Sequence, residues 1–122
     1  IFPNDSLTFD GSLRLTPFND TLAGTTYSNI TFNGGASSFT LSGNAVTVSG
    51  NVANNSINPQ TILLPLDFAS NMSLNVNGSA PLIIGGGWTN TDATGYTTNT
   101  LGGTGILTNL IGSDTAHGTT LM

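Results

Sequence analysis

One short phrase recurs along this chain and constrains what the chain can fold into. The phrase has two apolar residues separated by one residue, then Ser, Asn or Asp, then Gly, and then a small or polar residue. In an extended chain the two apolar side chains point to the same side, and the residue between them, often Thr, suits a strand. The polar residue and Gly favour a turn. Copies lie at residues 7–13, 30–36, 39–45, 46–52 and 74–80, with a weaker copy at 82–88.

Each phrase is therefore a very short strand followed by a corner. Such a strand is marginal alone, but stacked copies bury a continuous apolar column. The phrases begin roughly seven to nine residues apart, so three of them make a coil of about 20–25 residues, the size of a solenoid repeat. The sequence thus predicts an all-β parallel β-helix. The alternative is an antiparallel β-sandwich in which the Asn-Gly and Ser-Gly pairs close hairpins. The shortness of the strands and the Thr, Ser and Asn at outward positions favour the β-helix.

The pattern predicts a single solenoid domain over residues 1–122 with one interruption. A polar connection spans residues 16–28, and Phe18 and Leu22 are expected to turn inward from it, because Pro, Asn, Asp and Gly mark the rest as a loop. The expected parts are a coil at 6–86, a long Thr/Asn loop at 87–100, a return to the coil at 101–111 and a tail at 112–122.

The charge content excludes several classes of function. The 122 residues include one Arg, Arg14, no Lys and six Asp, which gives a net charge of −5. One basic residue cannot neutralise the phosphates of a nucleic acid or the headgroups of an anionic membrane. The chain has no Cys, which excludes disulfides, iron–sulfur clusters and thiolate zinc sites. No apolar run approaches transmembrane length, so no membrane insertion is expected in this segment.

Several of these phrases, in their order, resemble the autotransporter-associated β-strand repeat proteins of bacteria. The likeness covers most of residues 6–111, including Ala-Gly-Thr-Thr-Tyr-Ser-Asn-Ile-Thr-Phe-Asn at 23–33 and Leu-Gly-Gly-Thr-Gly-Ile-Leu-Thr at 101–108. The resemblance implies a right-handed parallel β-helix that forms the passenger region of a surface or secreted protein. It implies no catalytic or ligand-binding residues. The loop at 87–100 is longer than the compact corner of that family, and nothing here resembles its translocator barrel.

Residues that could carry chemistry are few and scattered. His117 is the only histidine and lies in the tail, with Asp114 three residues before it and no further ligand nearby. A carboxylate pair on stacked rungs could cleave polysaccharides, but Asp10 and Asp20 read as turn residues. The Gly-rich stretch 102–107 lacks the Asp that a calcium-binding repeat needs. We therefore expect no catalytic residues, no cofactor, no metal and no enzymatic activity.

Two kinds of surface feature remain as candidate sites. Six Asn-x-Ser/Thr sequons are possible N-glycosylation sites, and those in the polar stretches 16–28 and 53–60 are the best candidates. Trp88 and Tyr96 could form an aromatic contact patch, although residues of this kind more often cover the apolar core where a coil is interrupted. The sequons are at Asn4, Asn19, Asn29, Asn54, Asn71 and Asn77.

These observations lead to a structural hypothesis for function. We expect an extracellular or cell-surface β-helix element, such as a stalk or passenger segment, joined to flanking parts of a longer chain. The alternative is a self-assembling subunit of an extracellular filament, because an open β-helix end exposes apolar core and unpaired strand edges. A weaker alternative is an adhesin that binds a glycan through Trp88, Tyr96 and the Asn/Thr loops.

Overall fold

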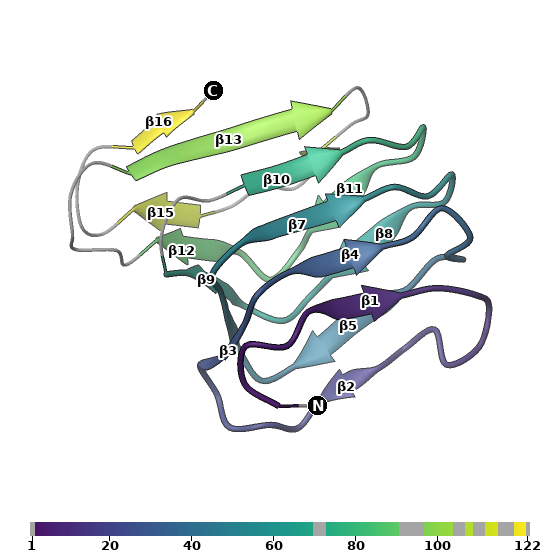
Figure 1. Ribbon diagram of the computed structural model, residues 1–122, viewed down its shortest axis with the longest axis horizontal. Helices are drawn as coiled ribbons and strands as arrows, with labels where there is room; N and C mark the ends of the chain where they lie inside the picture. The colour runs from purple at the N-terminus through teal and green to yellow at the C-terminus, as the bar shows by residue number, and fades with distance from the viewer. Residues whose placement is uncertain are drawn as a thin grey trace.

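The fold is a parallel β-solenoid (Figure 1). The computed structural model describes residues 2–69, 73–90, 97–103, 107–108, 112–114 and 119–121. Within these ranges every paired strand runs parallel to its neighbours, and no residue is helical. This confirms the predicted β-helix and excludes the antiparallel sandwich.

The strands form three sheets. The first sheet contains, in order, β1 (Leu7–Phe9), β4 (Ile30–Phe32), β7 (Asn51–Asn54), β10 (Ser73–Val76), β13 (Thr97–Gly103) and β16 (Thr119–Leu121). The second contains β2 (Phe18–Asn19), β5 (Thr40–Gly43), β8 (Gln60–Ile62), β11 (Leu82–Ile84) and β14 (Leu107–Thr108). The third contains β3 (Thr25–Tyr27), β6 (Val46–Val48), β9 (Leu66–Phe68), β12 (Trp88–Asn90) and β15 (Gly112–Asp114).

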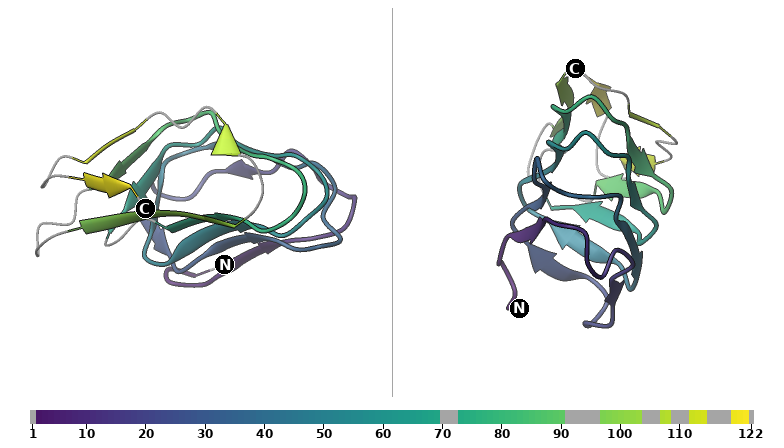
Figure 2. Two further views of the ribbon diagram at one scale, coloured as in Figure 1. Left: turned by 90° about the horizontal axis from the view of Figure 1, so that it is seen from above. Right: turned by 90° about the vertical axis from the view of Figure 1, so that its right-hand side faces the viewer.

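Successive strands go to different sheets, and every third strand returns to the same sheet. One turn of the coil, called a rung below, thus has three strands: rung 1 is β1–β3, rung 2 is β4–β6, rung 3 is β7–β9 and rung 4 is β10–β12. In the first sheet Ile30 pairs with Val52 and Val52 with Leu74, a repeat of 22 residues that falls within the predicted range. The turns therefore overlie one another when the coil is viewed from above (Figure 2).

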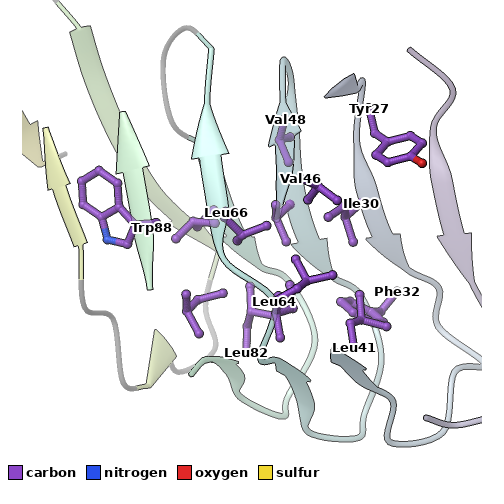
Figure 3. Close-up of a cluster of buried hydrophobic side chains, with 14 of the residues drawn as sticks. Tyr27, Ile30, Phe32, Leu41, Val46, Val48, Leu64, Leu66, Leu82 and Trp88 are labelled. Atoms are coloured by element: carbon purple, nitrogen blue, oxygen red, sulfur yellow. The ribbon is translucent and has the colours of Figure 1, made fainter. Parts of the chain in front are cut away.

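The core lies between the three sheets. In most three-residue strands the first and third side chains are buried and the middle one is half-exposed, as the alternation of apolar and polar residues predicts. Ile30, Val46, Leu66 and Leu82 point into this interior from different sheets (Figure 3). Each fully buried aliphatic or aromatic side chain contributes about 1.5–3 kcal/mol to folding, so the stacked columns are the main source of stability.

The structure differs from the prediction at the expected interruptions. The connection at 16–28 contains β2 and β3, and Phe18 and Leu22 are exposed by 68% and 84% instead of turning inward. Residues 88–90, expected in a loop, form β12 between β9 and β15, and β13 begins at Thr97. The expected tail contains β15 and β16. The coil thus continues where Thr, Asn and Gly replace the apolar residues that mark a strand in sequence.

Candidate functional site

Asn54, a predicted glycosylation site, is fully buried at the end of β7, where the chain turns from the first sheet to the second. Its Nδ2 donates hydrogen bonds to the carbonyl oxygens of Asn58 (3.2 Å), Ala80 (3.3 Å) and Pro81 (3.1 Å). Its Oδ1 accepts from the backbone N–H (2.9 Å) and Oγ (2.7 Å) of Ser56. A glycan on Nδ2 would displace all of these contacts, so the folded structure argues against Asn54 as an acceptor.

Asn54 belongs to a corner network, which consists of Asn54, Ser56, Asn58 and Gln60. Gln60 is also fully buried, and its Nε2 donates to Ser56 Oγ (3.0 Å) and to the carbonyl of Ser37 in rung 2 (2.7 Å). Its Oε1 accepts from the Phe39 N–H (2.8 Å). The network thereby satisfies buried backbone groups of rungs 2, 3 and 4, as buried polar groups require. Its geometry indicates a structural role.

The other predicted sequons differ in accessibility. Asn4 and Asn77 are exposed, so both remain accessible to modification. Asn19 and Asn29 are half-buried and hydrogen-bonded: Asn19 Oδ1 accepts from Thr21, and Asn29 Oδ1 accepts from the Asn51 N–H at 2.9 Å. Asn71 lies outside the described residues.

Trp88 is part of the core. Its side chain is 7% exposed, and its ring lies edge-on to Phe68 with a centroid separation of 6.5 Å (Figure 3). The indole Nε1 is buried and has no hydrogen-bond partner among the described residues. Because Trp88 faces inward, it does not contribute to an exposed aromatic patch. Tyr96, the other predicted member of that patch, lies outside the described residues.

The most distinctive surface is the N-terminal end of the coil. Leu7 and Phe9 pair with Ile30 and Phe32, but the two rung 1 residues are only partly buried whereas their rung 2 partners are fully buried. Above them lies a hollow of about 170 Å³. Its walls are mainly apolar and include Leu7, Phe9, Phe18, Tyr27, Ile30 and Leu41. The apolar column of the core is therefore open at this end.

Two strand edges border the hollow. In β1 the Leu7 N–H donates to rung 2 (2.8 Å) and the Phe9 carbonyl accepts from it (2.9 Å), so the peptide groups of Thr8 face away from rung 2. In β2 the carbonyls of the residues before and after Phe18 likewise bond to rung 2, so the peptide groups of Phe18 face away. The edge of β3 is covered, because the Asn4 N–H donates to the Thr26 carbonyl at 2.7 Å.

Exposed apolar side chains and charges both gather in this first rung. Four of the six large hydrophobic residues that are exposed in the described structure precede Thr25, namely Phe2, Leu13, Phe18 and Leu22. Asp5, Asp10, Arg14 and Asp20 lie in the same stretch and are exposed. We call this surface, with the hollow, the edges of β1 and β2 and these residues, the open N-terminal end. An apolar centre with a polar rim is the arrangement of an interaction surface.

Sequence reasoning identified an open end as a general hazard of a β-helix but missed the residues that form it. Phe18 was expected to turn inward, because its surroundings contain Pro17, Asn19 and Asp20 and read as a loop. The available signal was the apolar residue itself, placed one rung before Ser42, which it pairs with in the structure.

No other chemistry is assembled in the described part of the chain. It contains no group of three or more His, Cys, Asp or Glu side chains that could hold a metal ion, and none of its segments is a helix capable of crossing a membrane. The side chains of Asp114 and His117 lie outside it. Comparisons of the chain with protein-family models, curated proteins and solved structures found no match.

Proposed function

We propose that this chain is a structural element of an extracellular or cell-surface protein, a rigid β-solenoid that holds other parts of the protein at a distance. The observation that carries the proposal is the continuity of the coil. Each of rungs 1 to 4 is joined to its neighbours by parallel ladders in all three sheets and by a shared apolar column. A rod with this construction resists bending because each rung is held on three sides.

Side-chain hydrogen bonds between rungs add to this continuity on the outer surface. Asn77 Nδ2 donates to Asn55 Oδ1 at 2.8 Å, and Thr89 Oγ1 donates to Asp67 Oδ1 at 3.0 Å. Asn29 bonds both to the preceding rung, through Ser6, and to the following one. The outer faces present mostly uncharged hydroxyl and amide groups, which suits a solvated spacer. The composition and the resemblance to passenger repeats support the extracellular location.

The location can be tested by chemical labelling, because the chain contains no Cys. Ile57→Cys places a thiol at a site that is 74% exposed, and Val48→Cys places one in the core with little change in volume. A membrane-impermeant maleimide applied to intact cells of the source organism should label Ile57→Cys. The matched Val48→Cys variant should react only after the protein is unfolded. Labelling of Ile57→Cys only in broken cells would refute the proposed location.

The structural role predicts a shape. Small-angle scattering of the folded chain, joined at each end to a compact reporter domain by a two-residue linker, should give a well-defined distance between the two reporters. A broad distribution of distances would show a flexible connector and would contradict a rigid spacer.

A further inference from the structure

We propose that the open N-terminal end is a self-association surface that receives the C-terminal end of a second copy of this chain, head to tail. The proposal starts from the hollow, the open edges of β1 and β2, and the exposed side chains around them. An apolar cavity of about 150 Å³ holds a group the size of benzene, so a hollow of about 170 Å³ can receive an apolar side chain from a partner.

The geometry of the strands identifies the occupant. The inner side of rung 1 already forms an interface with rung 2, made of parallel ladders and an apolar column, and the open end presents the same elements on its outer side. At the opposite end of the coil the outermost strands of the same three sheets are β14, β15 and β16, which run in the same direction. A second copy in the same orientation therefore supplies parallel strands, as every internal rung does.

A reversed copy fits less well. If two N-terminal ends met, β1 would face the partner's β1 in an antiparallel arrangement, and two hollows would lie opposite each other with neither filled. A head-to-tail contact is heterologous, so it leaves one free end on each copy and produces open chains of copies rather than a closed dimer.

The N-terminal residues limit the strength of the contact. The backbone of Asn4 and Asp5 already bonds to the outer side of β3, through Thr26 and Ser28. A second copy can therefore extend the first and second sheets but not the third at this position. We expect a reversible association that depends on protein concentration.

Analytical ultracentrifugation of the full chain over a range of concentrations tests the proposal. The wild-type protein should shift from monomer to larger species as its concentration rises. Phe18→Thr removes an aromatic anchor from the hollow without adding charge and should lower the association constant about tenfold or more. Ile57→Thr is the matched control, since Ile57 is equally exposed but lies between β7 and β8 in rung 3. It should associate like the wild type.

Two results would overturn the proposal. One is a chain that stays monomeric at every concentration, which would leave the open end to a partner of another kind. The other is an equal loss of association in Phe18→Thr and Ile57→Thr, which would indicate nonspecific aggregation. Circular dichroism shows whether both variants are folded, and Phe18 is 68% exposed, so its replacement removes little core.

The orientation is tested separately. A compact folded domain fused directly after Met122 obstructs the C-terminal end and leaves the N-terminal end free. Head-to-tail association should then be lost, whereas retained dimers would show that two N-terminal ends meet and would refute the proposed orientation. These outcomes do not depend on the cellular location, so the labelling experiment and this one can fail independently.

Discussion

Replacing Asn54 by Ala should strongly destabilise the coil, although the substitution removes only polar atoms. Asn54 is fully buried, and its amide group provides an acceptor for the Ser56 N–H and a donor to the Ala80 carbonyl. Neither of these backbone groups has another hydrogen-bond partner in the described structure. The other groups that Asn54 contacts keep a bond: the Pro81 carbonyl still accepts from the Gln60 N–H, and the Asn58 carbonyl from Ser56 Oγ.

The magnitude follows from counting the groups that lose their partner. A buried donor or acceptor without a partner costs about 1–3 kcal/mol, and Asn54→Ala leaves two of them. We therefore expect a loss of about 2–6 kcal/mol in the free energy of unfolding. Because domains of this size are stable by only about 5–15 kcal/mol, the variant should be partly unfolded or close to it.

Asn77→Ala is the matched control. Asn77 follows β10 as Asn55 follows β7, and its side chain also bonds to another rung, but it is exposed. Water can replace that bond, so the loss should stay within about 0.5 kcal/mol.

Urea denaturation followed by circular dichroism measures both variants, and equal slopes against urea concentration show that the unfolding reaction is unchanged. If Asn54→Ala lost no more stability than Asn77→Ala, the corner network would not stabilise the rungs as argued here.

Three further predictions test other parts of the structure. Asn54→Asp places a carboxylate against carbonyl oxygens in a buried site, which raises its pKa in the folded state above the unfolded value of about 3.9; its stability should therefore be highest below pH 4 and fall as the pH rises, whereas wild-type stability measured in parallel should not show this added loss. Gly86→Ala brings a Cβ against the backbone carbonyls of Leu63 and Leu64 and should cost about 1–3 kcal/mol, while Gly34→Ala, where the nearest atom is 3.9 Å away, should be nearly neutral in the same urea assay. Self-association should strengthen between 0.02 and about 0.2 M salt, because screening weakens the repulsion between copies of net charge −5; sedimentation at both salt concentrations would contradict this if the monomer fraction rose.

The local pattern of the sequence was sufficient to predict the strands with an apolar residue on each side of a polar one. Ile30–Phe32, Val46–Val48 and Leu82–Ile84 all form strands whose outer two residues are buried. The alternation is visible within three residues, because a strand in this fold buries every second side chain. The repeat length followed from the spacing of these segments, and with it the parallel stacking.

The strands that the sequence did not reveal are those held by their neighbours. Thr25–Tyr27 has one apolar residue and Trp88–Asn90 has one, so neither shows alternation. They are strands because Val46–Val48 and Leu66–Phe68 offer open edges at the correct position in the next rung. Contacts between residues roughly one rung apart decide their conformation, and a local reading of the chain does not contain that information.

The corner network shows the same dependence on distant residues and adds a reason for its presence. Apolar columns favour stacking but discriminate weakly between alternative alignments, since Val, Leu, Ile and Trp all occupy equivalent positions in the third sheet and its neighbours. Buried amides are more selective: Gln60 bonds to Ser37 and Phe39 in rung 2, and Asn54 to Ala80 in rung 4. A shift of one residue between these rungs would reverse the face of each strand and leave these buried groups without partners. The amides of Asn54 and Gln60 therefore fix the alignment of rungs whose stability comes from apolar packing.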